Sequence, residues 1–190
     1  MLYTRKGDNG TTGIFGCDQR ISKSSNITEA LGSLDEVNSF LGLVKVKCND
    51  VQVGVMKILD TSFAKIVSDI QQNLFIIQAE VAGSRMSITE EKLKECENYA
   101  NEGERLLPPI KTFFVSGGTE IASIFDISRT LARKAERRVV SVAEETLEDK
   151  RQEISHLSLS YLNRLSSLLY VMARLANHNM GLVEEVPNYK

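Results

Sequence analysis

The sequence has no tryptophan, only two histidines and only three cysteines among 190 residues. Cys17, Cys48 and Cys96 lie far apart without C-x-x-C spacing, which argues against a disulfide framework and a zinc site and favours free thiols. No apolar run approaches the roughly 18 residues of a membrane span, and none follows a basic segment as in a signal peptide. We therefore expect a cytoplasmic protein without a membrane partner.

The scarcity of histidine also limits the chemistry. With two histidines, a Ser-His-Asp or Cys-His arrangement has little support. Glu153 and His156 form one Glu-x-x-His, but a di-metal bundle needs a second, and His178 has Leu175 three residues before it. We expect no metal cage built from protein ligands alone. The net charge of −2 gives no reason to expect a nucleic-acid partner, so any anion binding must be local.

Proline is confined to Pro108, Pro109 and Pro187, which leaves long stretches free to form helices. Apolar residues at helical spacing predict a single all-α domain, a five-helix bundle of the up-and-down type with four long helices and one shorter one. The helices are expected near residues 26–47, 50–81, 89–101, 119–145 and 152–177. The second would be one continuous helix roughly 45 Å long. Asn26 with Glu29 resembles a capping box, Thr119 an N-cap, and Gly83 and Gly181 helix ends.

A glycine-rich loop, TRKGDNGTTG, occupies residues 4–13. Gly7, Gly10 and Gly13 permit positive φ, so successive backbone N–H groups can face one concavity that holds an anion. The side chains of Thr4, Arg5, Lys6, Thr11 and Thr12 would add donors. The loop lacks Walker A spacing, and a plain glycine-rich turn is the alternative.

Residues 103–118 cannot stay helical through two prolines, yet they carry six large apolar side chains: Leu106, Leu107, Ile110, Phe113, Phe114 and Val115. Such a loop must be buried against its own bundle, a partner subunit or a ligand.

Two helices carry polar stripes. Asp126, Arg129, Arg133 and Glu136 share one face of the fourth predicted helix, a pattern that is most often a solvated ladder of ion pairs. The last helix has a polar face that suits burial or a ligand better than open water, formed by Asn163, Ser167, Tyr170, Arg174 and Asn177. Asp35, beside the small residues Gly32 and Ser33, suggests a close helix crossing at which Arg129 or Arg133 would be its partner.

Taken together and in order, several segments resemble the ATP:corrinoid adenosyltransferases of the propanediol-utilisation type. These segments are TRKGDNGTTG, Arg20 with Lys23, EALGSLDEVNSFLG at 29–42, FFVSGGTEIASIFDISRTLARKAERRVV at 113–140, and YLNRLSSLLYVMAR at 161–174. The resemblance implies a homotrimer with active sites at the subunit interfaces. The implied reaction moves the 5′-deoxyadenosyl group of ATP to the cobalt of cob(I)alamin, giving adenosylcobalamin and triphosphate. It needs positioning and charge stabilisation of the leaving group rather than a general base.

The resemblance also assigns roles to residues. Residues 1–25 would be the nucleotide-binding loop and residues 26–181 the bundle. The triphosphate, with Mg²⁺, would be held by Thr4, Arg5, Lys6, Gly7, Asp8, Gly10, Thr11, Thr12, Gly13 and Lys23. The adjoining subunit would complete the ATP site with Arg133, Lys134, Glu136, Arg137 and Asn163. Asp35 and Arg129 would pair across the subunit boundary. Phe113 would lie below the corrin and exclude the lower axial ligand, with core filling as the alternative role.

The chain departs from the family pattern at two places. Lys134 stands where many relatives have arginine, so the planar fork for a bidentate phosphate contact is lost. The spacer between Arg20 and Lys23, formed by Ile21 and Ser22, is often one residue shorter. Possible further partners are a cobalamin reductase and an adenosylcobalamin-dependent enzyme. Two alternatives remain open: a non-catalytic trimeric carrier or regulator that binds ATP or a corrinoid, and a purely structural helical protein.

Overall fold

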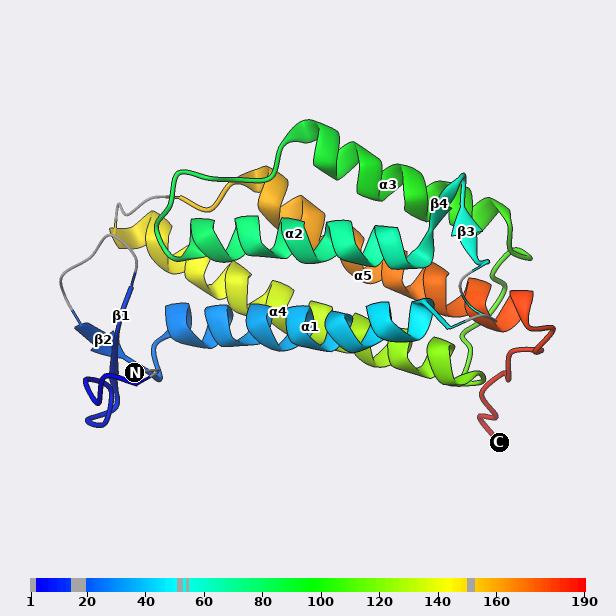
Figure 1. Ribbon diagram of the computed structural model, residues 1–190, viewed down its shortest axis with the longest axis horizontal. Helices are drawn as coiled ribbons and strands as arrows, with labels where there is room; N and C mark the ends of the chain where they lie inside the picture. The colour runs from blue at the N-terminus through cyan, green and yellow to red at the C-terminus, as the bar shows by residue number, and fades with distance from the viewer. Residues whose placement is uncertain (1–2, 15–19, 51–52, 54, 150–152) are drawn as a thin grey trace.

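The computed structural model describes residues 3–14, 20–50, 53, 55–149 and 153–190; for residues 146–149 it describes the backbone only. Five helices run in alternating directions: α1 (Asn26–Cys48), α2 (Phe63–Val81), α3 (Glu90–Arg105), α4 (Glu120–Asp149) and α5 (His156–Asn179). Figure 1 shows that they lie side by side as an up-and-down bundle. The predicted all-α five-helix fold is confirmed. No helix in the described ranges is both long and apolar enough to cross a membrane.

The second predicted helix is wrong in its first half. A short hairpin of β3 (Lys57–Ile58) and β4 (Thr61–Ser62) comes before α2, and Leu59 in its turn has φ of 54°. Ser62 then caps α2, because its side chain accepts a hydrogen bond from the Lys65 N–H at 3.3 Å. The 19 residues of α2 span only about 28 Å. The predicted residues 51, 52 and 54 lie outside the described part.

Helix ends follow the glycines. Gly83 and Gly181 have φ of 99° and 70°, and each follows the last turn of a helix. Ser84 N–H donates to the Ala79 carbonyl, and Leu182 N–H to the Asn177 carbonyl, both at 2.9 Å. These bonds form the Schellman pattern, so both predicted ends are confirmed. The predicted capping box is wrong: Ser25 is the N-cap residue of α1, and the Asn26 amide instead donates to Glu145 on α4.

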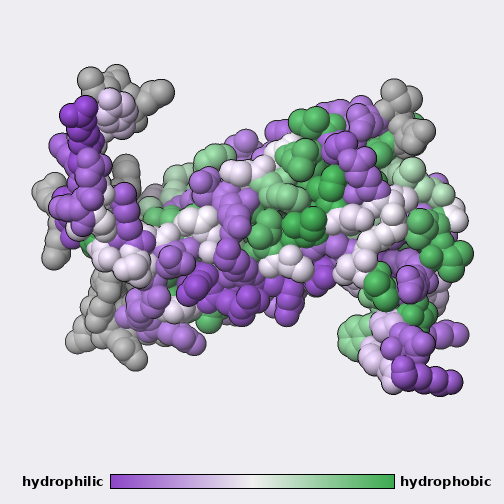
Figure 2. Space-filling view, turned by 90° about the horizontal axis from the view of Figure 1, so that it is seen from below, coloured by the Kyte–Doolittle hydropathy of each residue, from purple (hydrophilic) through white to green (hydrophobic). Residues whose placement is uncertain are grey.

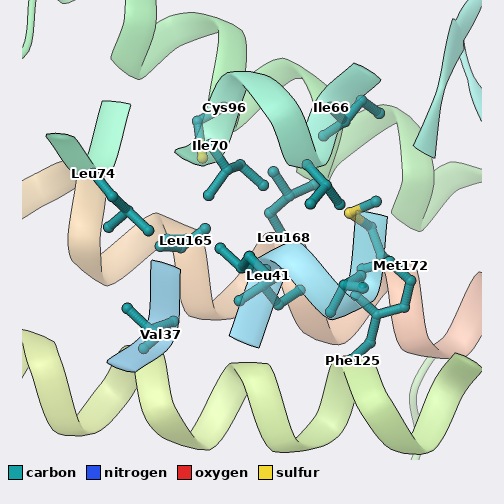
Figure 3. Close-up of a cluster of buried hydrophobic side chains, with 14 of the residues drawn as sticks. Val37, Leu41, Ile66, Ile70, Leu74, Cys96, Phe125, Leu165, Leu168 and Met172 are labelled. Carbon is teal, nitrogen blue, oxygen red and sulfur yellow. The ribbon is translucent and has the colours of Figure 1, made fainter. Parts of the chain in front are cut away.

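The core lies between all five helices. Figure 3 shows Leu41 of α1, Ile70 of α2, Phe125 of α4 and Leu168 of α5 among the side chains that meet in it. Cys96 of α3 also points into this cluster, and Cys48 is buried elsewhere in the core; both are free thiols, as predicted. Cys17 lies outside the described residues.

Only Cys96 and Gly103 of α3 are buried, which confirms its prediction as a surface helix. Gly103 allows it to approach α5 closely, because a Cβ there would lie 2.5 Å from a Val171 methyl carbon.

The two ends of the bundle differ. A hairpin of β1 (Thr11–Gly13) and β2 (Arg20–Ser22) stands at the end where α1 begins and α4 finishes. The loop of residues 106–119 and the C-terminal tail lie at the opposite end (Figure 1). The glycine-rich loop and the apolar loop of one chain are therefore separated by the length of the bundle.

Candidate active site

The N-terminal loop is held in shape by Arg20. Its guanidinium donates to the hydroxyl and the carbonyl of Thr11, at 2.8 and 2.7 Å, and to the carbonyl of Lys6 at 2.6 Å. The antiparallel pairing of β1 with β2 places Arg20 opposite Gly13. Sequence reasoning did not assign Arg20 to the site. The closeness of Arg20 to the glycine-rich loop in the sequence is the signal that could have indicated this role.

The loop is less open as an amide cradle than expected. Lys6 and Thr11 N–H groups donate to the side chains of Thr4 and Asn9, while Asp8 and Gly10 N–H groups donate to backbone carbonyls of the loop. Positive φ occurs at Gly10, 77°, and at the non-glycine Arg5, 59°, but not at Gly7 or Gly13. In this conformation, four amides that would have faced an anion are already used, so an anion held here would depend mainly on the cationic side chains.

Besides Arg20, three cations lie at the loop. Arg5 and Lys6 are exposed within it, and Arg5 lies over the Tyr3 ring. Lys23, which directly follows β2, reaches back to the loop, since its ammonium lies 3.0 Å from where a Cβ on Gly7 would be. A side chain at position 7 would displace this ammonium. The structure thus brings Lys23 to the loop despite the longer spacer in the sequence.

A second group of predicted residues meets on the α4–α5 face near the other end of the bundle. Phe113, Arg129 and Arg133 line one open pocket of about 360 Å³. Its other walls come from the apolar loop and α5: Ile110, Thr112, Phe114, Ser116, Ser166, Ser167 and Tyr170. A lining that combines aromatic rings with guanidinium groups suits a flat ligand that carries both apolar surface and negative charge. Ser166 and Phe114 were not predicted as site residues, although Phe114 belonged to the apolar loop.

Arg129 is oriented within its own chain. Asp126, which is buried, accepts from Arg129 Nε at 3.3 Å and from the Gly117 N–H at 3.1 Å. The Arg129 guanidinium also lies 5.8 Å from the centre of the Tyr170 ring. Partial burial raises the pKa of the Tyr170 phenol, which keeps it a neutral donor beside the arginine. The polar stripe of α4 is therefore not simply a solvated ladder.

Asp35 does not occupy a close helix crossing within the chain. It is exposed, and Gly32 beside it has open space where a Cβ would be. Arg129 pairs with Asp126 instead, so the prediction that Asp35 needs Arg129 or Arg133 as a partner is wrong for a single chain. A pairing across a subunit boundary remains a prediction.

The remaining predicted nucleotide residues are spread over α4 and α5. Asn163 Nδ2 donates to Glu136 Oε1 at 2.9 Å, which fixes these two side chains together. Lys134 forms an ion pair of 2.5 Å with Glu36 on α1, so its ammonium points toward that helix. Arg133 and Arg137 are exposed on α4.

The two groups of site residues do not meet in one chain. Arg133 and Glu145 are 12 residues apart on α4, about 18 Å along its axis, and Glu145 accepts from Asn26 at the hairpin end. The glycine-rich loop lies beyond that end (Figure 1). Each chain therefore holds the two groups of predicted site residues at different places on its surface.

Large apolar side chains are exposed in the apolar loop and on α1 and α4. Leu107 is buried in the core and Phe114 is half-buried, whereas Phe113 is 79 % exposed and Leu106, Ile110 and Val115 are exposed as well, so the bundle covers only part of the apolar loop. Figure 2 views the side of α1 and α4 and shows apolar surface over its middle and toward the loop end, while the hairpin end is hydrophilic. Exposed large apolar residues of α1 and α4 are Leu43, Val46, Ile127 and Val140. Of the three predicted ways to bury the loop, the chain's own bundle accounts for Leu107, and burial of the exposed side chains by a partner subunit or a ligand stays a prediction.

The polar face of α5, predicted to be buried or to face a ligand, is buried only near its C-terminal end, at Arg174 and Asn177, whereas Asn163 and Ser167 are exposed. Asn177 accepts from Thr119 N–H at 2.9 Å and donates to the Gly117 carbonyl at 2.9 Å. Gly117 and Gly118 have φ of 123° and 108°, and Gly118 allows this close approach, because a Cβ there would lie 2.5 Å from Asn177 Oδ1. Thr119 then caps α4, since its hydroxyl accepts from Ala122 N–H at 3.3 Å. Asn177 thus joins the end of α5 to the start of α4.

Comparison with known proteins agrees with this geometry. Residues 2–176 match the family model described as cobalamin adenosyltransferase. The corrinoid adenosyltransferase of Bacillus subtilis is 35 % identical over 95 % of this chain and 89 % of its own length. The corrinoid adenosyltransferase PduO of Citrobacter freundii is 34 % identical over 94 % of this chain but only 50 % of its own length. The chain thus spans about half the length of the PduO relatives that it matches.

Solved structures show the same fold. A variant of the PduO-type ATP:corrinoid adenosyltransferase from Lactobacillus reuteri, complexed with cobalamin and ATP, superposes with a TM-score of 0.85. It is 27 % identical, and the match covers 100 % of this chain and 97 % of that one. Since the family model matches nearly the whole chain and the bundle agrees with the solved structures, this chain belongs to the cobalamin adenosyltransferase family.

Proposed function

We propose that the protein transfers the 5′-deoxyadenosyl group of ATP to the cobalt of a cob(I)alamin-type corrinoid and releases triphosphate. The observation that carries the proposal is the pocket in which Phe113, Arg129 and Arg133 face a common space. The similarity to corrinoid adenosyltransferases, including one complexed with cobalamin and ATP, supports it.

The chemistry is a displacement at carbon. The electron pair of cob(I)alamin attacks C5′ of ATP, a Co–C bond forms, the C5′–O bond breaks, and triphosphate leaves with that bonding pair. The protein must align the two reactants and stabilise the charge on the leaving group. Arg5, Lys6 and Lys23 would hold the triphosphate within residues 1–25, and Arg133 with Arg137 would approach it from α4 of a neighbouring chain. Thr4, Gly7, Asp8, Gly10, Thr11, Thr12 and Gly13 would shape the cradle. Mg²⁺ would be bound mainly by the phosphates, as is usual for this ion.

Phe113 would control the lower face of the corrin. A ring in this position excludes the lower axial ligand, which makes reduction of cobalt to cob(I) easier. The exposure of Phe113 at the mouth of the pocket supports this role over core filling. The reducing electron would come from a separate cobalamin reductase, and an adenosylcobalamin-dependent enzyme would receive the product. Because ATP is the proposed substrate, the protein would act in the cytoplasm.

A homotrimer would bring the half-sites together. Two observations support it: the halves of one chain lie at different places on the bundle, and α1 and α4 expose apolar side chains on their outer side. In that assembly, the nucleotide site would be completed by Lys134, Glu136 and Asn163. Asp35 would pair with Arg129 of a neighbouring chain. All of these residues belong to the bundle, residues 26–181.

The activity is tested by giving the purified protein ATP, Mg²⁺ and chemically reduced cobalamin under anaerobic conditions. We expect the absorbance change of a light-sensitive Co–C bond. ATP binding without that change would favour the non-catalytic carrier. No ATP binding by calorimetry would favour a structural helical protein.

The shared site is tested by complementation. Lys6→Ala and Arg133→Ala, each inactive alone, are co-expressed. If one site uses the loop of one chain and α4 of another, random mixing leaves about one-quarter of the sites intact, since each half is drawn independently. If both halves come from one chain, mixing restores no activity.

A further inference from the structure

The loop that carries Phe113 has few anchors of its own. In the described part of the chain, two hydrogen bonds reach residues 108–116 from elsewhere. Arg174 Nη2 donates to the Pro108 carbonyl at 3.4 Å, and Val115 N–H donates to the Glu185 carbonyl at 2.8 Å. One anchor comes from α5 and the other from the tail that follows it.

Arg174 connects these two anchors. Its guanidinium lies 4.9 Å from the centre of the Phe114 ring, the neighbour of Phe113. Its Nε donates to both carboxylate oxygens of Glu184, at 2.8 and 3.2 Å. Arg174 is only 3 % exposed, so its charge depends on this carboxylate for compensation.

The residues around Phe113 are therefore fixed while Phe113 itself is free to meet a ligand. Phe114 is stacked on Arg174, and Val115 is tied to the tail. Phe113 makes neither contact and is exposed at the pocket. The position of its ring is thus set through its neighbours.

We propose that Glu184 and Arg174 are positioning residues, and that the tail segment 182–185 is a strap that holds the Phe113 loop at the height required below the corrin. This rests on the proposed function. Loss of the Glu184 carboxylate leaves the Arg174 charge buried without its partner, so the guanidinium must turn toward water and release both Phe114 and Pro108. The side chains that would hold the triphosphate, on the glycine-rich loop and at Arg133, are not part of this strap and should keep their positions.

The test compares Glu184→Ala with Glu185→Ala. Both variants remove one negative charge from the tail. Among the described residues, Glu185 contributes to the strap through its backbone carbonyl, which the alanine substitution keeps. We expect Glu184→Ala to slow adenosylation from cob(II)alamin plus reductant about tenfold to a hundredfold, as small misplacements near a reacting group do. The rate from pre-reduced cob(I)alamin and the Kd for ATP should change less than about twofold, because those steps do not need the Phe113 ring to displace the lower ligand.

One further measurement and one further variant separate positioning from damage to the fold. Electron paramagnetic resonance of bound cob(II)alamin should show the lower ligand retained in Glu184→Ala and displaced in the wild type and in Glu185→Ala. Glu184→Gln keeps an oxygen acceptor for Arg174 and should give an intermediate effect, which decides the matter if the alanine variant does not fold. Equal rates for the Glu184 and Glu185 variants, or equal slowing from cob(I) and cob(II), would overturn the proposal.

Failure of the proposed function gives a different result. In that case the wild type forms no Co–C bond even from cob(I)alamin, and the positioning role is refuted together with the activity. Hydrogen exchange at the Val115 amide still decides whether a strap exists: faster exchange in Glu184→Ala than in Glu185→Ala shows that the tail holds the loop, and equal exchange shows that it does not.

Discussion

Replacing Arg133 by alanine should separate the site from the fold. Arg133 is exposed on α4, and in the described residues it forms no ion pair or hydrogen bond within its chain. Its removal should therefore change the free energy of unfolding by no more than about 0.5 kcal/mol, as for other exposed side chains. A thermal melt of the variant should overlay that of the wild type.

The expected loss of activity is much larger. A guanidinium presents two parallel donors to a phosphate, and hydrogen bonds to charged groups contribute about 1.5–3 kcal/mol each. Loss of both raises the barrier by about 3–6 kcal/mol, which is a decrease of about 10²–10⁴ in kcat/KM at 1.36 kcal/mol per tenfold. The assay is the anaerobic formation of the Co–C bond from ATP and cob(I)alamin.

Arg138→Ala is the matched control. Arg138 lies on the same helix, is exposed, and contacts Glu29 at 3.7 Å, on a different side of α4 from Arg133. It should keep wild-type kcat/KM. Near-normal turnover of Arg133→Ala, or an equal loss in both variants, would show that the pocket arginine does not contact the leaving group.

Three further outcomes follow from the structure. Phe113→Ala should slow the reaction from cob(II)alamin more than from pre-reduced cob(I)alamin; equal effects would refute a role below the corrin. Gly103→Ala should destabilise the fold in urea unfolding, because a Cβ 2.5 Å from a valine methyl carbon costs about 1–3 kcal/mol, more than the gain of about 1 kcal/mol in helix propensity. Gly42→Ala, whose nearest atom would be at 3.8 Å, should instead be neutral or stabilising. Burial raises the pKa of Cys48 and Cys96 to about 12, so native protein at pH 8 should resist thiol labelling at both, as read by mass spectrometry. Because the folded state favours the protonated thiols, their contribution to the free energy of unfolding is fully present below the unfolded pKa of about 8.5. It decreases as pH rises toward 12.

The sequence by itself determined the elements whose signals are local. Helical periodicity and the scarcity of proline gave five helices, and the glycines at 83 and 181 closed two of them because positive φ is a property of the residue itself. The order of short motifs identified the family and hence the candidate residues. Local signals gave a wrong prediction at the start of α2, because the apolar spacing begins before the helix does. Leu59 turns the chain with a positive φ, and Ser62 then caps the helix.

Only the tertiary structure decided which residues act together. The polar face of α5 indicated burial but not that Arg174 would face Glu184 of the tail or that Asn177 would hold Gly117. Nor did the sequence show that Asp126, rather than Asp35, would be the partner of Arg129 within the chain. These pairings join residues from different elements, so they depend on how helices and loops meet in space. Periodicity along the chain fixes which face a residue occupies, but not what that face will meet.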